Sequence, residues 1–226
     1  MIKINHIENI NNLKKKFFRD GYVKIEGLFN IKYLKMLKKH TTNLRNKYKT
    51  QEIQIHKNNR RVEELFKNNV LKNQISFILN FKSIYGLQSE RFFNPPKTIG
   101  FPPHQDDFFI RSGRYNSANL WIPFQNVRKK NGSLFFFTKS NKEKINSKLN
   151  LKSLNDKNFK LSKFKRYKKK SINCNIGDAI LISNRVIHGS GGNKSNSRRE
   201  VLVLGYIKKG SKFNSGKTAR RKPFKI

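Results

Sequence analysis

Residues 118–138 read ANLWIPFQNVRKKNGSLFFFT, in which two apolar runs flank the turn signal Asn131-Gly132, and this pattern indicates the fold class. Such runs, rich in aromatic and branched residues and bounded by turn residues, are typical of short strands. The same pattern continues on both sides, and further strands are expected at residues 83–87, 90–93, 108–110, 171–175, 179–183 and 201–207. Many short strands at this spacing predict a sandwich or barrel, of which a jelly roll is the natural candidate.

The N-terminal third has a different pattern. Residues 10–19 place apolar residues at the spacing of a short amphipathic helix, and Asp20-Gly21 should end it. A strand is expected at 22–25, a basic helix at 28–48 and a further helix at 61–81. The fold class predicted is therefore mainly β with N-terminal helices, which should pack against the outside of the jelly roll.

The length of 226 residues fits one domain. We expect that domain to span residues 1–207, with a lysine-rich insertion or lid at 139–170 and a basic C-terminal tail at 208–226. Both lysine-rich segments have few apolar anchors, which is typical of solvated loops and tails. The alternative interpretation is that they form a basic lid and a basic arm that contact a partner.

The formal net charge of +38 is extreme. Coding bias toward Lys, Asn, Ile and Phe explains part of it, but the total of only 13 Asp and Glu needs a further reason. The functional alternative is an acidic partner: nucleic acid, an anionic membrane surface, an acidic protein or an anionic small molecule. The composition leaves the two explanations open.

The single cysteine, Cys174, excludes an internal disulfide and a cysteine-based zinc site. The first residues lack the apolar core of a signal peptide, and no window approaches the ~18 apolar residues of a membrane span. We therefore expect a cytoplasmic protein without a transmembrane segment.

A possible metal site is visible in His104-Gln105-Asp106, followed 84 residues later by His188. In an extended segment the side chains of residues 104 and 106 point to the same side, so both could reach one ion. Two imidazoles and one carboxylate hold Fe(II) on one face and leave the other face open. A lone His-x-Asp motif is more often a hydrogen-bonded pair at the surface than a metal site. The other histidines, His6, His40 and His56, are expected to be surface residues.

Several motifs in order strengthen the metal interpretation: residues 18–28, Pro95-Pro96-Lys97, residues 104–106, 119–124, 131–134, 177–179 and 188–190, then Asn193, Arg199 and Tyr206. With these motifs the chain resembles, from its N-terminus to about residue 207, the phytanoyl-CoA dioxygenase-like (PhyH) family of Fe(II)/2-oxoglutarate-dependent oxygenases. The resemblance implies a double-stranded β-helix, the cupin-like jelly roll.

The resemblance also implies roles for individual residues. His104, Asp106 and His188 would be the metal ligands, and no further catalytic residue is implied. Arg199 would form an ion pair with the distal carboxylate of 2-oxoglutarate, since a planar guanidinium suits bidentate binding. Ser190 would hydrogen-bond the same carboxylate, and Gln88 and Trp121 would line the cosubstrate pocket.

Arg198 competes with Arg199 and would point to the opposite side of its strand. Alternation cannot choose between them, because Val201 and Val203 are as apolar as Leu202 and Leu204. The spacing from His188 in the family favours Arg199.

The function implied is a dioxygenase that uses Fe(II), 2-oxoglutarate and O2 to hydroxylate an anionic small molecule, with succinate and CO2 as coproducts. The carboxylate of Asp106 favours hydroxylation over halogenation, because halogenating relatives carry a small residue there. Two alternatives remain. One is an oxygenase acting on RNA or an acidic protein, and the other is a non-catalytic basic jelly roll that binds nucleic acid.

Overall fold

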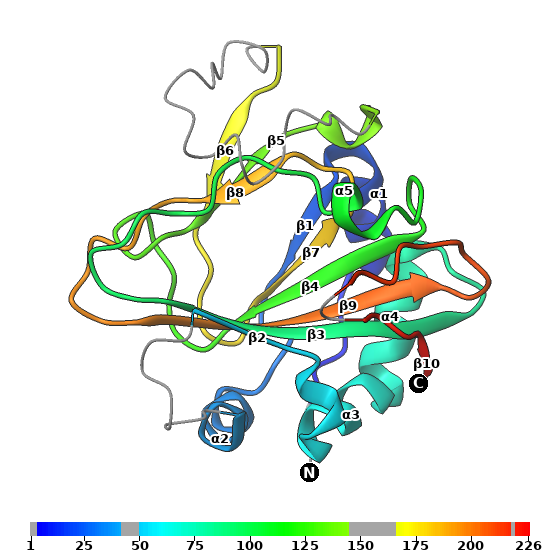
Figure 1. Ribbon diagram of the computed structural model, residues 1–226, viewed down its shortest axis with the longest axis horizontal. Helices are drawn as coiled ribbons and strands as arrows, with labels where there is room; N and C mark the ends of the chain where they lie inside the picture. Colours follow the sequence, from blue (N-terminus) through cyan, green and yellow to red (C-terminus); the bar gives the residue numbers. More distant parts are fainter. Residues whose placement is uncertain (1–3, 42–49, 145–165, 218–219) are drawn as a thin grey trace.

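Two antiparallel sheets face each other in the computed structural model (Figure 1), which describes residues 4–41, 50–144, 166–217 and 220–226. The larger sheet has the strand order β1-β7-β4-β9-β3-β10, with β2 also paired to β3. Its strands are β1 (Tyr22–Ile25), β7 (Ala179–Ser183), β4 (Ser117–Pro123), β9 (Arg199–Lys208), β3 (Ile84–Asn94), β10 (Phe224–Lys225) and β2 (Gln51–Ile53). The smaller sheet has the order β6-β5-β8, from β6 (Lys169–Ile172), β5 (Leu134–Phe137) and β8 (His188–Ser190). The predicted jelly roll is confirmed.

The central strands of the larger sheet are buried on both faces, which explains why their sequences are apolar without alternation. One face packs against the helices, and Leu120, Leu181 and Leu204 belong to that core. The other face points toward the smaller sheet, where Trp121 and Val203 belong to a second cluster. Alternate residues of one strand therefore lie on opposite faces of the sheet. One set packs against the helices, and the other set points toward the smaller sheet and forms the wall of the cavity.

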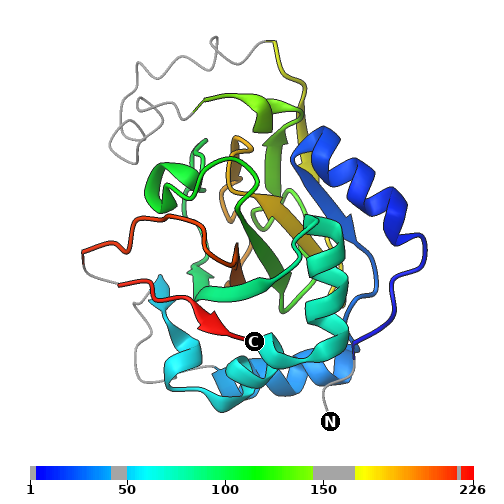
Figure 2. The ribbon, with the colours of Figure 1, turned by 90° about the vertical axis from the view of Figure 1, so that its right-hand side faces the viewer.

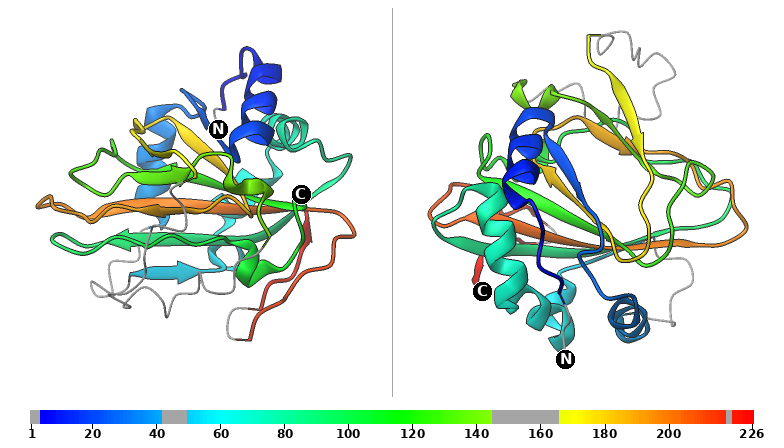
Figure 3. Two further views of the ribbon diagram at one scale, coloured as in Figure 1. Left: turned by 90° about the horizontal axis from the view of Figure 1, so that it is seen from above. Right: turned by 180° about the vertical axis from the view of Figure 1, so that it is seen from behind.

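Four helices, α1 (Ile10–Asp20), α2 (Ile31–Thr41), α3 (Arg60–Lys67) and α4 (Asn69–Leu79), cover the outer face of the larger sheet (Figures 2 and 3). The helix end predicted at Asp20-Gly21 is confirmed. Gly21 has φ 86°, and its N–H donates to the carbonyl of Phe17 at 2.8 Å. Glycine adopts this left-handed conformation without the steric cost of a Cβ.

The single helix predicted at 61–81 is wrong, because α3 and α4 are separate helices that meet at Asn68. The backbone of Asn68 is extended, and its side chain accepts a hydrogen bond from the Leu71 N–H at 3.0 Å. Asparagine stabilises a new helix start in this way, so the local cap overrides the continuous apolar pattern. For the helix expected at 28–48, α2 accounts for the first part, and residues 42–49 lie outside the described residues.

Two strand predictions need correction. Residues 83–87 and 90–93 belong to one long strand, β3, which carries an irregularity between Gly86 and Gln88. Residues 108–110 do not form a strand but the short helix α5 (Asp107–Ile110). The buried carboxylate of Asp107 accepts hydrogen bonds from the N–H groups of Ser112 and Gly113, which turns the chain tightly here.

The segments predicted to be basic excursions are described only in part. Residues 145–165 of the expected insertion lie outside the described residues. In the expected tail, β10 pairs with β3 and Phe224 stacks on His56, with ring centroids 4.4 Å apart. His56 is only 8% exposed, so its predicted surface position is wrong; the ring fills a slot beside Phe66. Among the described residues no helix is long and apolar enough to cross a membrane.

Candidate metal and cosubstrate site

A backbone bridge brings the two histidines of the predicted site together. The N–H of His104 donates to the carbonyl of His188 at 2.9 Å, and the reverse hydrogen bond is 3.0 Å long. This antiparallel pair places the imidazoles side by side, with ring centroids 4.4 Å apart. Residues 84 positions apart in the sequence thus share one edge of the cavity because β8 pairs with the approach to α5.

Asp106 reaches the same point, but not for the reason given by the sequence. Its backbone is helical (φ −60°, ψ −31°) and it precedes α5, so the extended i, i+2 geometry expected for residues 104–106 is wrong. The next residue, Asp107, fixes the turn: its carboxylate accepts from Asn184 at 2.9 Å and pairs with Arg185 at 2.9 Å. Asp107 therefore anchors α5 to the β7–β8 connection, and Asp106 is left pointing at the histidines.

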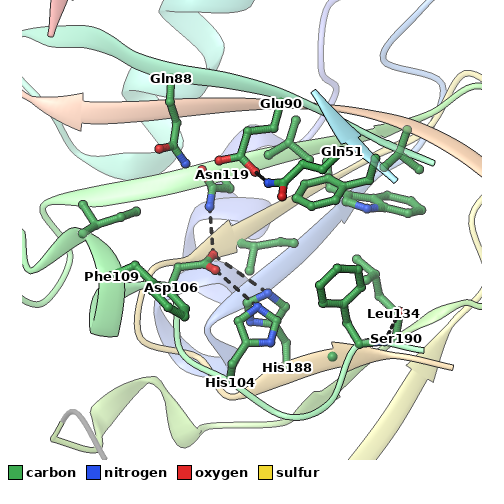
Figure 4. Close-up of a pocket in the computed structure, with 18 of the residues that line it drawn as sticks. Gln51, Gln88, Glu90, His104, Asp106, Phe109, Asn119, Leu134, His188 and Ser190 are labelled. Carbon is green, nitrogen blue, oxygen red and sulfur yellow. Dashed lines mark hydrogen bonds and ion pairs between the residues drawn. The ribbon is translucent and has the colours of Figure 1, made fainter. Parts of the chain in front are cut away.

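The three side chains converge on one point (Figure 4). His104 Nε2 lies 3.5 Å from Asp106 Oδ1, and His188 Nε2 lies 3.9 Å from Asp106 Oδ2. One potential ligand atom from each residue lies within 4.8 Å of the others. The second carboxylate oxygen also accepts a hydrogen bond from Asn119 Nδ2 at 2.8 Å, which orients the carboxylate.

Both imidazoles are fixed in a form that suits metal binding. His104 Nδ1 lies 2.9 Å from the carbonyl oxygen of Pro102, and His188 Nδ1 lies 3.0 Å from that of Val186. A carbonyl oxygen only accepts, so each Nδ1 carries a proton and each Nε2 is the ring nitrogen that faces the cavity. Holding the second ring nitrogen in this way is what a metal-binding histidine requires.

The charges of Asp106 and His188 agree with this arrangement. Burial acts to raise the pKa of Asp106, but the two imidazoles and Asn119 outweigh it and lower that pKa to about 2. Burial lowers the pKa of His188 to about 4. Burial also acts to lower the pKa of His104, but Asp106 more than offsets it and the pKa is raised. The site therefore holds an ionised carboxylate and a neutral His188 near pH 7, which are the metal-binding forms.

A cavity of about 280 Å³ opens beside the three residues. Its walls combine apolar side chains, such as Phe92, Trp121 and Val203, with a few polar groups. This volume lies just below the usual range of roughly 300–1,000 Å³ for ligand pockets, and the mixture of apolar walls with a few polar groups is typical of them. Among the residues predicted for the cosubstrate, Arg199, Ser190, Gln88 and Trp121 all line the cavity.

Arg199 is the most informative of these residues because its buried charge has no counter-ion among the described residues. The residue is 3% exposed, Nη1 donates to the carbonyl of Gly132 at 3.0 Å, and Nε has no hydrogen-bond partner. It forms no ion pair with any acidic residue in the described part of the chain. Burial alone lowers its pKa to about 10. A buried, uncompensated guanidinium at a cavity wall calls for an anionic ligand.

Arg199 and Arg198 also differ in position, because their side chains lie on opposite faces of β9. Arg199 shares the inner face of β9 with Val201 and Val203, which line the cavity, whereas Leu202 and Leu204 face the helices. Arg198 lies on the other side, with its guanidinium 4.3 Å from the ring centroid of Phe93. The structure thus places Arg199, and not Arg198, at the cavity.

The other predicted residues have definite neighbours. Ser190 Oγ accepts from the Phe101 N–H at 3.0 Å and so anchors the segment before His104. Trp121 lies beneath Arg199, with the guanidinium carbon 5.9 Å from the ring centroid. Gln88 accepts a hydrogen bond from Arg221 Nε. Gln88 therefore faces the cavity while already bonded to the C-terminal segment.

Sequence reasoning missed four polar residues of the cavity: Gln51, Glu90, Asn119 and Arg221. Asn119 and Glu90 lie on the inner faces of β4 and β3, two residues from Trp121 and Gln88, so correct strand parity would have found them. Gln51 and Arg221 come from segments with no recognisable signal. Burial, followed by the charge of Asp106, raises the pKa of Glu90 to about 7.

Comparison with known proteins agrees with the geometry. The family model described as phytanoyl-CoA dioxygenase (PhyH) matches residues 17–201. No curated protein sequence matches the chain significantly.

Several solved structures share the fold. The carbocyclase SnoK from nogalamycin biosynthesis, described as non-heme and alpha ketoglutarate dependent, has a TM-score of 0.76 at 13% identity, covering 96% of this chain and 91% of its own. EctD from S. alaskensis with 2-oxoglutarate and 5-hydroxyectoine has a TM-score of 0.73 at 18% identity, covering 100% and 83%. The epimerase SnoN in complex with Fe3+, alpha ketoglutarate and nogalamycin RO has a TM-score of 0.71 at 14% identity, covering 96% and 95%.

Proposed function

This chain belongs to the phytanoyl-CoA dioxygenase family of Fe(II)- and 2-oxoglutarate-dependent oxygenases, and on that premise we propose that it hydroxylates a small molecule carrying an anionic group. The observation that carries the proposal is that one cavity combines a His-Asp-His cluster with the uncompensated guanidinium of Arg199. The cluster supplies the ligands for the metal, and Arg199 supplies the charge for the cosubstrate. Among the described residues no acidic side chain pairs with Arg199, so an ion pair within the fold does not explain the burial of its charge.

The residues fit both groups. His104, Asp106 and His188 would hold Fe(II) on one face, which leaves positions open toward the cavity. Arg199 would bind the distal carboxylate of 2-oxoglutarate, and this ion pair would offset the cost of its own burial. When bound, iron and cosubstrate supply the oxidising chemistry: one oxygen atom of O2 enters the substrate as a hydroxyl, and the other enters succinate as CO2 is lost.

The protein's own contribution is orientation and exclusion of water. Asn119 holds one carboxylate oxygen of Asp106, and the carbonyls of Pro102 and Val186 hold the imidazoles. Trp121 and its apolar neighbours line the same cavity as the metal cluster and Arg199. A small cavity with fixed polar groups keeps the reacting C–H bond close to the oxidant and keeps bulk water out.

The proposal that the substrate is anionic rests on the net charge of the protein. The net charge of +38 creates a positive field that would attract anions and raise their local concentration. Contact with a polyanion such as RNA stays a prediction, because most of the 139–170 segment on which it depends lies outside the described residues. A cytoplasmic location also stays a prediction.

The test begins with anaerobic titration of the full chain with Fe(II) and then 2-oxoglutarate, followed by the visible metal-to-ligand charge-transfer band. We expect a band that is lost or altered in Asp106→Ala. The loaded protein is then given O2 and a panel of small carboxylates and phosphates beside their neutral esters, and succinate and products are measured by mass spectrometry. We expect succinate formation stimulated by an anionic compound, whose product gains 16 Da. Absence of the band at saturation, or equal stimulation by the neutral esters, would contradict the proposal.

A further inference from the structure

The C-terminal segment contributes a basic side chain to the cavity. After β9 the chain crosses α5, where the Asn214 N–H donates to the carbonyl of Ile110 at 2.6 Å, and then returns to the edge of β3 as β10 (Figure 2). Phe224 fixes this return, because its ring occupies the space that a Cβ at Gly86 would fill. Between these anchors, Arg221 lines the cavity.

Hydrogen bonds hold the guanidinium of Arg221 in place without using all of its N–H donors. Its backbone N–H donates to the carbonyl of Ser215 at 2.7 Å, Nη1 donates to the carbonyl of Asn214 at 3.3 Å, and Nε donates to Gln88. Nη2 makes no hydrogen bond within the described ranges. The guanidinium is therefore oriented by neutral acceptors and keeps donor capacity toward the cavity.

Glu90 contributes an acidic side chain to the same cavity as Arg221. It lies on the inner face of β3, two residues from Gln88, and its Oε2 accepts a hydrogen bond from Gln51 Nε2 at 3.0 Å. Oε1 has no partner among the described residues. Figure 4 shows Gln51, Gln88 and Glu90 along one wall, facing Asp106 and the two histidines across the cavity.

The two charges lie near each other without forming an ion pair. Each affects the other electrostatically, yet no nitrogen of Arg221 lies within 4.0 Å of a Glu90 oxygen. A guanidinium and a carboxylate in one cavity attract strongly, so a purely structural pair would be in contact. Here a separate amide holds each group: Gln88 holds Arg221, and Gln51 holds Glu90. The free donor and the free acceptor are thus kept apart and available.

We propose that Arg221 and Glu90 form a substrate subsite for a zwitterion, an amino acid or a short amino-acid derivative, with its carboxylate on Arg221 and its ammonium group on Glu90. This inference rests on the proposed function, and it names the substrate class of the same cavity. The anionic group proposed above is then the carboxylate of the zwitterion. The cavity of about 280 Å³ must also admit 2-oxoglutarate, which restricts the substrate to a small molecule.

Electrostatics and position support the subsite. Glu90 is partly buried and no cation contacts it among the described residues, which agrees with its raised pKa; an ammonium group at Oε1 would offset the cost of its desolvation. Since the subsite faces the metal cluster across the cavity, a substrate held by both charged ends presents its carbon chain to the iron. Arg221 and Glu90 would then determine which C–H bond is oxidised.

The test measures binding, not turnover. The full chain, loaded anaerobically with Fe(II) and 2-oxoglutarate, is titrated calorimetrically with the twenty protein amino acids and with β-alanine, 4-aminobutyrate and 5-aminopentanoate, which vary the charge separation. Each compound that binds is compared with its N-acetyl derivative, which lacks the ammonium group, and its methyl ester, which lacks the carboxylate. We expect at least one zwitterion to bind at least tenfold more tightly than both derivatives.

Variants assign each charge to its residue. Arg221→Gln should weaken the zwitterion at least tenfold and leave the methyl ester unchanged, whereas Glu90→Gln should weaken the zwitterion and leave the N-acetyl derivative unchanged. Lys222→Gln, an exposed neighbour, removes the same charge as the first variant and should change nothing. If 2-oxoglutarate itself does not bind, the proposed function fails and this inference fails with it. If 2-oxoglutarate binds but no zwitterion does, or an N-acetyl derivative binds as tightly, only the subsite is refuted.

Discussion

Replacing Arg199 with methionine should have opposite effects on stability and on cosubstrate binding. In the ligand-free protein the guanidinium is buried without a counter-ion, and burial lowers its pKa from 12.5 to about 10. At about 1.4 kcal/mol per pKa unit, this corresponds to a burial cost of about 3 kcal/mol. Methionine follows the same unbranched path without a charge. It removes that cost, as replacement of buried charges by apolar side chains often does.

The loss of two interactions of Arg199 reduces this gain in the free energy of unfolding. The carbonyl of Gly132 loses its hydrogen bond from Nη1, at about 1 kcal/mol, and the contact with the Trp121 ring at 5.9 Å contributes less than that. We therefore expect Arg199→Met to stabilise the metal-free protein by about 1–2 kcal/mol. In contrast, losing one partner of a buried charge pair costs about 2–5 kcal/mol, so 2-oxoglutarate should bind at least ~30-fold more weakly.

Both quantities are measured on the same preparations. Urea denaturation of the metal-free protein gives the free energy of unfolding, and anaerobic titration of the Fe(II)-loaded protein gives the affinity for 2-oxoglutarate. Arg198→Met is the matched control: it removes the same charge from the opposite face of the strand and should leave 2-oxoglutarate affinity unchanged. A threefold or smaller loss of affinity in Arg199→Met would refute the cosubstrate role. Destabilisation by more than about 1 kcal/mol would refute the claim that the buried charge is uncompensated.

Three further predictions follow from individual contacts. Asn119→Ala removes the hydrogen bond that orients Asp106, so Fe(II) affinity should fall by about 10- to 100-fold; an unchanged affinity by competition with a chelator would rule out that role. Tyr206→Phe removes a fully buried hydroxyl that has no hydrogen-bond partner in the described part of the chain, and should raise the free energy of unfolding by about 1 kcal/mol; a loss in urea denaturation would point to a partner outside it. Burial lowers the pKa of His56 to about 4, below the unfolded value near 6.5, so the unfolded state takes up the proton first and stability should fall by up to about 3 kcal/mol from pH 6.5 to 4. His56→Phe keeps the ring stack with Phe224 and should flatten that part of the stability profile; an equally steep profile would assign the loss to other groups.

Local sequence was sufficient for elements whose signals are short-range. Gly21 ends α1 because only glycine adopts the required backbone at low cost, and β1, β4, β5, β7 and β9 lie close to the runs of apolar residues that predicted them. The signal failed where a side chain redirected the backbone. Asn68 starts a new helix inside a continuous apolar pattern, and Asp107 folds residues 108–110 into a turn of helix.

The candidate site was anticipated in its residue types but not in its geometry. His104, Asp106 and His188 were named from the sequence, yet Asp106 faces the histidines because Asp107 is bound by Asn184 and Arg185, which no local pattern indicated. The polar groups supplied by other strands, such as Glu90, and by the C-terminal segment, such as Arg221, were not anticipated. Their place in the cavity depends on strand pairing between distant parts of the chain.

Residue identity and local order were enough to predict the strand-rich fold class, the types of the metal ligands and an arginine near the second histidine. Alternation along the strand could not choose between Arg198 and Arg199; the family spacing favoured Arg199, and the tertiary structure places Arg199 at the cavity. Both faces of β9 are buried, one by helices and one by the opposite sheet, so apolar residues occupy both and alternation carries no information. The side that holds the metal cluster exists only once the two sheets have closed around the cavity, and Arg199 is the arginine on that side.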